Sequence, residues 1–316
     1  MGSDRVAEAA QRYVPGDGPV AVERLGRGLV NETHRVLRDG RLYSLRMPAA
    51  QPAPVGVDRE WECRVLTVAS AAGLAPVIER CEPRLGVLVA RWEGGRALDA
   101  EEARQPETGA RVAELARRVH ALVLPGNARI VRAGDWIAYY REALERLPLE
   151  RKRAMERRRA PRTRGAAADA DLLQAEAERR LGALQAVPRG PDVLCHSDLH
   201  PANLVASERG LVLLDWEYAH VAEALWDLAG WACNLDLEPQ AQVLLLASYL
   251  GRPAAREEQR RLEDLTWLYD YICLLWAEVY CGATDASDRL ILERGRVLAG
   301  RLASRSGGGP GELPAH

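Results

Sequence analysis

The sequence is poor in several residue types, and most of these shortages exclude a class of protein. Its 316 residues include no phenylalanine, which excludes no class, and one lysine, Lys152. No apolar run is long enough to span a bilayer, and the opening residues MGSDRVAEAAQRYVPG lack the apolar core of a secretion signal. We therefore expect a cytoplasmic protein with no membrane partner.

The spacing of the cysteines and the small net charge also exclude certain kinds of site and partner. None of the six cysteines lies in a C-x-x-C pair. We expect them to be small buried apolar residues rather than a disulfide set or a zinc site; they are Cys63, Cys81, Cys195, Cys233, Cys273 and Cys281. The formal net charge of −2 gives the chain no general attraction for nucleic acid or an anionic membrane.

One segment, RKRAMERRRAPRTRG at residues 151–165, is strongly basic and could form an RNA-binding patch. However, no aromatic residues that could stack on bases lie between its arginines, and acidic residues punctuate or flank it on helix-like stretches. We interpret it as a solvated helical connection and expect no nucleic-acid partner. An RNA-associated protein stays as an alternative, which would show a steep dependence of binding on salt.

The segment HSDLHPAN, residues 196–203, concentrates polar side chains. His196 and His200 have the spacing of two zinc ligands on one helical face. Pro201 argues against this site, because the residue before a proline is pushed out of the helical region. We therefore expect a loop, followed by a buried strand over the apolar run 211–214 that ends at Asp215.

The polar residues of this stretch suit phosphoryl transfer. Asn203 offers an amide oxygen and Asp215 a carboxylate, and magnesium takes such hard oxygen ligands while it bridges substrate phosphates. Asp198 then remains to accept the proton of a hydroxyl group. Positioning and charge neutralisation supply most of the rate in this reaction.

HSDLHPANL followed by LLDWEY resembles the catalytic and metal-binding loops of the protein-kinase-like small-molecule kinases, the superfamily of aminoglycoside phosphotransferases, choline kinases and thiamine kinases. The family pattern H-x-D-x-x-x-x-N implies that Asp198 is catalytic and that Asn203 and Asp215 hold magnesium. The usual D-F-G is replaced by Asp215-Trp216-Glu217, which is typical of the small-molecule branch. The resemblance implies ATP and Mg²⁺ as cofactors, and this segment resembles choline and thiamine kinases more than aminoglycoside enzymes.

The resemblance also implies a two-lobed α+β fold. Residues 1–94 would form a small N-terminal nucleotide-binding lobe, an antiparallel sheet with one main helix, which ends in a hinge. Residues 95–305 would form a larger, mostly helical catalytic and acceptor-binding lobe, and residues 306–316 a disordered tail. Residues 22–47 accordingly read as two or three strands with turns at Gly26–Gly28 and Asp39–Gly40.

In the nucleotide-binding lobe, the resemblance assigns Gly26, Gly28 and Asn31 to a phosphate loop, although a Gly-x-Gly alone is more often just a tight turn. Kinases place a cation, usually lysine, on the third strand. The only lysine lies elsewhere, and the resemblance places Arg46 at this position, where choline and thiamine kinases commonly have arginine. A guanidinium can hold phosphate oxygens with two parallel hydrogen bonds.

The ion-pair partner of Arg46 should come from the next helix, where Glu60 and Glu62 are both candidates and the family spacing favours Glu62. By resemblance, the hinge whose backbone contacts adenine is expected where the chain leads through Glu93-Gly94-Gly95. The expected nucleotide-binding residues there are Arg91, Trp92 and Glu93.

Two further residues are expected to support the catalytic loop. Asp227 lies on an apolar helical face, where a buried carboxylate must find donors. By resemblance it tethers the backbone of the catalytic loop. His196 is expected to pack that loop and is given no proton-transfer role.

The acceptor site is the least defined. The helical segment DLTWLYDYICLLWAEVY places Trp267, Asp270 and Tyr271 on one face. Aromatic rings with carboxylates suit a cationic acceptor, but aromatic core with acids at its rim is equally compatible. Glu217, beside the metal ligand, is a further candidate for the acceptor's positive group.

We therefore expect an ATP- and magnesium-dependent phosphotransferase that acts on a hydroxyl of a small, cationic molecule such as choline, ethanolamine or thiamine. An aminoglycoside or macrolide O-phosphotransferase is the alternative in the same class. A nucleotide-binding pseudokinase is disfavoured, because all catalytic positions are filled. The sequence predicts no oligomeric state.

Overall fold

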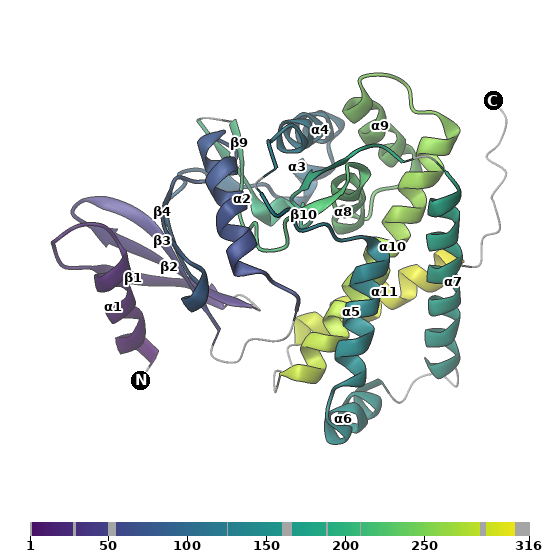
Figure 1. The fold of residues 1–316 in the computed structure, drawn as a ribbon, viewed down its shortest axis with the longest axis horizontal. Helices are drawn as coiled ribbons and strands as arrows, with labels where there is room; N and C mark the ends of the chain where they lie inside the picture. Colours follow the sequence, from purple (N-terminus) through teal and green to yellow (C-terminus); the bar gives the residue numbers. More distant parts are fainter. Residues whose placement is uncertain are drawn as a thin grey trace. The chain divides into compact units, whose positions relative to one another are not determined.

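The computed structural model describes residues 2–27, 30–49, 55–124, 126–159, 166–187, 189–208, 210–284 and 289–306. These residues form two compact units (Figure 1). The first comprises Met1–Pro52, Val57–Ile130 and Asp192–Gly251, and the second Ala53–Gly56, Val131–Pro191 and Arg252–His316. The lobe boundary at residue 94 stays a prediction. The predicted tail lies outside the described residues, except for Ser306 at the end of the last helix.

The first unit contains all the strands of the described chain. Its elements are α1 (Gly2–Tyr13), β1 (Ala21–Arg27), β2 (Asn31–Arg38), β3 (Arg41–Pro48), α2 (Arg59–Ala71), β4 (Ile78–Glu82), η1 (Pro83–Leu85), β5 (Val87–Arg91), β6 (Arg96–Ala97), α3 (Ala100–Arg104), α4 (Pro106–His120), β7 (Asp192–Cys195), η2 (Pro201–Asn203), β8 (Leu204–Ser207), β9 (Gly210–Leu213), β10 (His220–Glu223), α8 (Leu225–Leu235) and α9 (Pro239–Leu250).

A five-stranded antiparallel sheet in the order β1-β2-β3-β5-β4 forms the N-terminal part of this unit. The β2–β3 hairpin turns at Asp39 and Gly40, which both have positive φ angles of 48° and 74°. Such a turn matches the right-handed twist of the paired strands, and Asp-Gly tolerates it well. The predicted strands and the predicted turn at Asp39–Gly40 are confirmed.

Helix α1 covers one face of the sheet. Its Val6 and Ala10, and Val14 directly after the helix, are buried with Val36 of β2 and Leu45 of β3 in one apolar cluster. Side chains alternate along a strand, so the next residue after Leu45, Arg46, points to the opposite face. The sheet thereby separates an apolar core from a polar, functional face.

Helix α2 begins directly after Asp58. The side chain of Asp58 caps it by accepting a hydrogen bond from the backbone N–H of Trp61 (3.0 Å), which satisfies one of the unpaired donors of the first turn. The helix buries an apolar face together with one carboxylate, that of Glu62.

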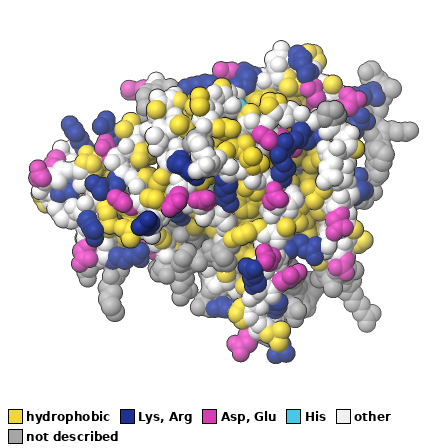
Figure 2. Space-filling model, viewed as in Figure 1, with side chains coloured by type: hydrophobic (Ala, Val, Ile, Leu, Met, Phe, Trp, Pro, Cys, Tyr) yellow, Lys and Arg dark blue, Asp and Glu magenta, His cyan; other side chains and the backbone are white. Residues whose placement is uncertain are grey.

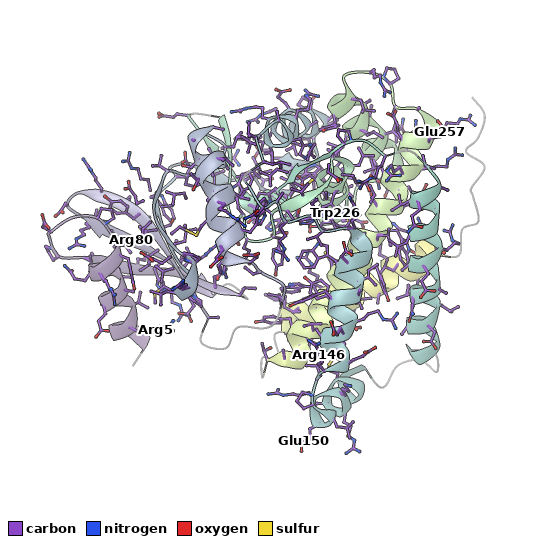
Figure 3. All side chains as sticks on the ribbon, viewed as in Figure 1. Arg5, Arg80, Arg146, Glu150, Trp226 and Glu257 are labelled. Carbon is purple, nitrogen blue, oxygen red and sulfur yellow. A yellow bond between two sulfur atoms is a disulfide. The ribbon has the colours of Figure 1, made fainter. Side chains whose placement is uncertain are left out.

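The cysteines differ from the sequence-based expectation in one respect. Cys63 of α2 and Cys81 of β4 form a disulfide, with their Cα atoms 5.9 Å apart (Figure 3). The expectation that no cysteines form disulfides is wrong for this pair, because the fold brings α2 beside β4 and sequence spacing gave no sign of it. Cys195, Cys233 and Cys281 form no disulfide and are buried, as expected, whereas Cys273 is partly exposed, against the expectation.

Beyond β5 the chain crosses to two smaller sheets, with orders β6-β8-β9 and β10-β7. At the crossing, Gly95 has a φ of +127°, and an added Cβ would lie 2.2 Å from the carbonyl oxygen of Ala206. Only glycine fits so close an approach of two backbones. Strand β9 confirms the predicted strand over the apolar run 211–214 to within one residue.

All the regular secondary structure described in the second unit is helical. Its helices are α5 (Ala133–Glu145), α6 (Leu149–Arg159), α7 (Ala166–Ala186), α10 (Arg256–Ala283) and α11 (Arg289–Ser306). Helix α10 packs against the other four. The basic run begins in α6, which agrees with the predicted helical connection up to residue 159; residues 160–165 lie outside the described part.

The surface shown in Figure 2 carries Lys and Arg side chains interspersed with Asp and Glu. Among the described helices, none combines the length and the hydrophobicity that crossing a membrane requires.

Candidate active site

The segment after β7 is a loop, as predicted. His200 has extended backbone angles (φ −151°, ψ 162°), directly before Pro201 and the short helix η2. This is the restriction that a following proline imposes. His196 and His200 therefore do not share a helical face, and the zinc interpretation is excluded on geometry.

Asn203 is hydrogen-bonded to Asp198. Its side-chain nitrogen donates to the backbone carbonyl of Asp198 (3.1 Å) and to Oδ2 of its carboxylate (3.0 Å). His200 Nε2 lies 3.5 Å from the same Oδ2. Because the Asn203 nitrogen is used in this way, its amide oxygen is the atom that a cation would contact. The Asp198 side chain is 30% exposed, so a substrate hydroxyl can reach it.

Asp227 of α8 makes the predicted contact with the catalytic loop. Its buried carboxylate accepts hydrogen bonds from the backbone N–H groups of His196 (2.9 Å) and Ser197 (2.7 Å). Ser197 has a φ of +69°, a conformation that non-glycine residues adopt only when their surroundings impose it. The two hydrogen bonds thus hold the backbone directly before Asp198 in a strained conformation.

His120, at the end of α4, supports Asp227 and was missed by the sequence analysis. Its Nε2 lies 3.1 Å from Asp227 Oδ2, and its Nδ1 lies 2.8 Å from the Tyr249 hydroxyl. Burial alone would raise the pKa of Asp227, but His120 and the other donors lower it. A single histidine in a helix 107 residues before Asp227 carries no local signal for this contact.

The side chains of His120, Cys195 and Asp227 have potential ligand atoms within 4.8 Å of one another. They do not have the character of a metal site. The Asp227 carboxylate already accepts three hydrogen bonds or polar contacts, and burial raises the pKa of the Cys195 thiol well above its ordinary value. Because the Asp227 carboxylate is already hydrogen-bonded to the loop backbone, this cluster is a hydrogen-bonded support for the loop.

His196 joins the catalytic loop to the segment that carries Asp215. Its Nε2–H donates to the carbonyl of Leu214 (2.8 Å), and its Nδ1 accepts from the backbone N–H of Asp198 (3.3 Å). This pattern requires a neutral ring, in agreement with burial, which lowers the pKa of His196. Trp216 packs edge-on against the ring, with centroids 4.8 Å apart.

Two backbone features bring the proposed metal ligands together. The backbone N–H of Leu214 donates to the backbone carbonyl of Asn203 (2.8 Å), so Asp215 follows directly at this end of the strand. Asp215 has a φ of +56°, and its side chain is 40% exposed. An amide oxygen and an accessible carboxylate are oxygen donors of the type that fits magnesium.

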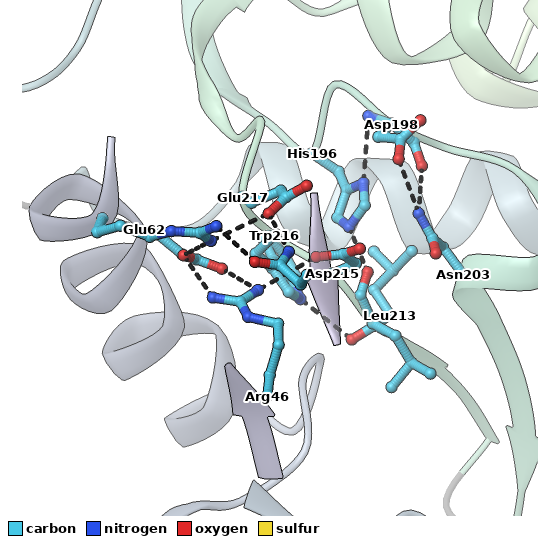
Figure 4. A network of polar contacts seen from close by, with 12 residues as sticks. Arg46, Glu62, His196, Asp198, Asn203, Leu213, Asp215, Trp216 and Glu217 are labelled. Atoms are coloured by element: carbon cyan, nitrogen blue, oxygen red, sulfur yellow. Dashed lines mark hydrogen bonds and ion pairs between the residues drawn. The ribbon is translucent and has the colours of Figure 1, made fainter. Parts of the chain in front are cut away.

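Arg46 connects the sheet, α2 and Asp215 (Figure 4). Its Nη1 and Nη2 lie 2.6 and 2.7 Å from the two carboxylate oxygens of Glu62, and Nη1 also lies 3.2 Å from Asp215 Oδ1. Glu60 is exposed and Glu62 is 1% exposed, so the structure selects Glu62 as the partner. Burial alone would raise the pKa of Glu62, but Arg46 and Arg59 hold it below its ordinary value.

Glu217 faces the N-terminal sheet. Its Oε2 accepts from Asn31 Nδ2 (2.6 Å) and from Arg59 Nη1 (3.0 Å). Burial and the neighbouring Asp215 raise the pKa of Glu217 to about 7, although Arg46, Arg59 and Asn31 oppose the shift. The predicted contact of Glu217 with the acceptor's positive group is not what this geometry shows, because the carboxylate is 4% exposed and already bound on this side.

The phosphate loop and the hinge are described in part. Gly26 lies in β1 opposite Thr33, where the strand register shifts, whereas Gly28 lies outside the described residues. At the hinge, the backbone N–H of Trp92 donates to Leu42 (3.0 Å). The Arg91 side chain pairs with Glu79 (2.6 Å) on the surface, and Glu93 follows in the segment that leads to β6.

The three tentative acceptor residues of α10 lie in the second unit, and each is at most 5% exposed: Trp267, Asp270 and Tyr271. The Arg180 guanidinium covers the Trp267 ring at 5.2 Å, and Asp270 pairs with Arg301 and with Arg305 (3.3 Å) of α11. The prediction that these residues form an acceptor-binding face is therefore wrong, and the alternative of a buried aromatic core holds. Arginines of the same unit cover Trp267 and neutralise Asp270.

The fold of this chain is similar to solved structures of small-molecule kinases and phosphotransferases. A choline/ethanolamine kinase family protein from Mesorhizobium loti is 23% identical, with 96% of this chain and 94% of that chain covered and a TM-score of 0.73. A choline kinase from Streptococcus pneumoniae is 17% identical, with 95% and 98% covered and a TM-score of 0.72. A spectinomycin phosphotransferase is 11% identical, with 96% and 98% covered and a TM-score of 0.61.

These matches confirm the two-lobed, kinase-like α+β fold. No curated protein matches the chain in sequence. The family model described as the phosphotransferase enzyme family matches residues 21–277, a range that includes the sheet, α2 and both site loops. The chain therefore belongs to the phosphotransferase enzyme family, and it is a small-molecule kinase as the sequence predicted.

Proposed function

We propose that the protein is an ATP- and magnesium-dependent kinase that phosphorylates a hydroxyl group of a small cationic molecule of the choline or ethanolamine type. One observation carries this proposal: the accessible Asp198 carboxylate is hydrogen-bonded to Asn203, whose amide oxygen is left for a cation. The position of Asp215 at the end of the adjoining strand supports it further.

In this reaction, Asp198 orients the acceptor hydroxyl and accepts its proton. The hydroxyl oxygen forms a bond to the γ-phosphorus of ATP, while the bond from that phosphorus to the bridging oxygen of the ADP leaving group breaks. Proton transfer to a positioned base contributes roughly 10² to 10⁴ in rate. Magnesium, which Asn203 and Asp215 would hold, neutralises phosphate charge when bound.

The sheet supplies a surface for the nucleotide. Leu37 and Leu42 are cross-strand partners and are 44% and 41% exposed. Leu42 lies on the same face of β3 as Arg46, because two and four residues along a strand return to one face. The exposed leucines next to the Trp92 segment suit the flat, apolar adenine ring, and Arg46 lies where phosphates would follow.

The cationic acceptor is supported by resemblance rather than by a binding site in this chain. The choline and ethanolamine kinase structures superpose with TM-scores of 0.70–0.73, and the aminoglycoside phosphotransferases with 0.61–0.62. A hydroxyl of an aminoglycoside is therefore the second candidate. Neither choice uses Trp267 or Asp270, which are occupied within the helical unit.

The test is ADP release from Mg-ATP with choline, ethanolamine, thiamine and kanamycin supplied separately. We expect turnover with one of the first two, no turnover after removal of magnesium with a chelator, and none in the Asp198→Asn variant. Turnover with kanamycin alone would select the aminoglycoside candidate. Binding of ATP without turnover on any of the four would contradict the proposed acceptor class.

A further inference from the structure

We propose that Arg59 is a positioning residue for phosphoryl transfer, which holds the end of the phosphate loop and the metal-bearing segment in register. The proposal rests on the proposed function. Arg59 is the first residue of α2, and the sequence pattern of the family gave no reason to select it.

The guanidinium of Arg59 contacts three side chains from three parts of the first unit. Nη2 donates to Oδ1 of Asn31 (2.7 Å), the first residue of β2. Nη1 donates to Oε2 of Glu62 (2.9 Å) and to Oε2 of Glu217 (3.0 Å). Asn31 also donates to Glu217 (2.6 Å), so the contacts form a closed network.

The ends of this network lie next to reacting groups. Asn31 follows the Gly-x-Gly segment expected to contact phosphates, and Glu217 lies two residues after Asp215. Glu62, the third contact, is the partner of Arg46. Loss of Arg59 would therefore remove a hydrogen-bond partner from Asn31, at the end of the phosphate loop, and from Glu217, near the metal ligand. It would also remove a partner of Glu62, the carboxylate that orients Arg46.

Charge gives an independent reason for Arg59. Glu62, Asp215 and Glu217 gather three carboxyl groups, against which the network sets two guanidinium groups, those of Arg46 and Arg59. Without Arg59, these three carboxyl groups would have only the Arg46 guanidinium to balance their charge within this network. Glu217 lies two residues from Asp215 and would then repel it, so the carboxylates would move apart.

Helix stability does not account for this residue. The positive end of the helix dipole lies at the N-terminus, where a cation is unfavourable. The Arg59 side chain is also 18% exposed, whereas apolar residues such as Trp61, Val65 and Leu66 anchor the helix. An arginine at this place fits a role in the network.

The experiment compares Arg59→Met and Arg59→Lys with a matched control, Arg64→Met, on the same helix. Arg64 packs over Trp61 and bonds Gly126, outside the network. Removing a residue that orients ligands costs roughly 10- to 100-fold in activity or metal affinity, and we expect Arg59→Met to lose that much in kcat/KM for Mg-ATP. The KM for the acceptor should stay unchanged, and the control should change by only about twofold.

Arg59→Lys should recover part of the loss, because lysine restores the charge but cannot bond three side chains from one planar group. Melting temperatures of all variants show whether any of them is less stable. A double variant that combines Arg59→Met with Glu217→Gln completes the test. If Glu217 acts through Arg59, the loss in the double variant is smaller than the product of the two single losses.

The outcomes separate this proposal from the proposed function. Mg-ADP affinity is measured by calorimetry in each variant without acceptor. A wild-type protein that binds Mg-ADP but phosphorylates none of the acceptors would refute the proposed acceptor class. The role of Arg59 would then still be tested by the change in Mg-ADP affinity in the Arg59 variants. Unchanged kinetics and unchanged Mg-ADP affinity in Arg59→Met would overturn the positioning role, as would failure of the wild type to bind any nucleotide.

Discussion

Arg46 holds both oxygens of the buried Glu62 carboxylate, at 2.6 and 2.7 Å, and reaches Asp215 at 3.2 Å with one of the same nitrogens. A single planar guanidinium thus serves a helix and the metal-bearing segment together. Lysine, the usual residue at this position of kinases, has a single nitrogen and could not make the same three contacts.

Arg46→Lys is therefore expected to be harmful even though the charge is kept. The variant should lose at least one charge-assisted hydrogen bond, each worth about 1.5–3 kcal/mol, which corresponds to a rise of tenfold or more in the KM for Mg-ATP. Steady-state kinetics at saturating acceptor measures this. Arg41→Lys, an exposed position of the same strand, is the control, and an equal effect there would contradict the argument.

Asp198→Asn tests the proposed base. The variant keeps the size of the side chain but cannot accept the hydroxyl proton, so kcat should fall by roughly 10² to 10⁴ while Mg-ATP affinity stays near the wild-type value. Rapid-quench kinetics and calorimetry give the two quantities. Asp236→Asn, an exposed aspartate with a φ of +50° that asparagine tolerates, should leave both unchanged. Loss of nucleotide binding in Asp198→Asn would mean that Asp198 has no separate role.

The Cys63–Cys81 disulfide should contribute to stability. The two cysteines are separated by 18 residues, and closing a loop of that size stabilises a fold by about 3 kcal/mol in the chain-entropy estimate. A dithiol that supplies two electrons and two protons converts the disulfide into two thiols. Urea unfolding with and without dithiothreitol should show the loss in the wild type.

The double variant Cys63→Ser with Cys81→Ser is the control for this effect, because it should begin at the lower stability and not respond to dithiothreitol. Since Cys63 directly follows Glu62, activity should also fall on reduction. A wild-type protein indifferent to the reductant would show that the bond contributes nothing in solution.

Stability should depend on pH through His196. Burial lowers the pKa of His196 in the folded chain, whereas in the unfolded chain it is near 6.5. The unfolded state therefore binds the proton more readily at this site, so His196 should make the free energy of unfolding rise with pH up to about 6.5 and then level off. Glu217, whose pKa burial and Asp215 raise to about 7, contributes in the opposite direction over the same range. Protonation would also put a hydrogen on Nδ1, which now accepts from Asp198 N–H.

Urea unfolding between pH 5 and 8 measures this dependence. His196→Gln removes the titrating group and should reduce the slope below pH 6.5, by up to about 1.4 kcal/mol per pH unit. Some slope should persist, because burial also lowers the pKa of His34. An unchanged slope in His196→Gln would show that His196 does not contribute to it.

By itself the sequence determined the parts of the protein that depend on local chemistry. Pro201 fixed the loop at His200, Asp39–Gly40 fixed a hairpin, and the motif spacing identified the family and its fold class. These features follow from backbone restrictions and turn geometry that act over a few residues.

Only the tertiary structure decided which distant groups meet. It selected Glu62 over Glu60, joined Cys63 to Cys81 and turned Glu217 toward Asn31 and Arg59. It also placed arginines against Trp267 and Asp270, where the sequence allowed an open acceptor face. Sequence periodicity says that a side chain lies on a buried face, but whether a cation of the chain or a ligand neutralises it depends on elements far away in the sequence.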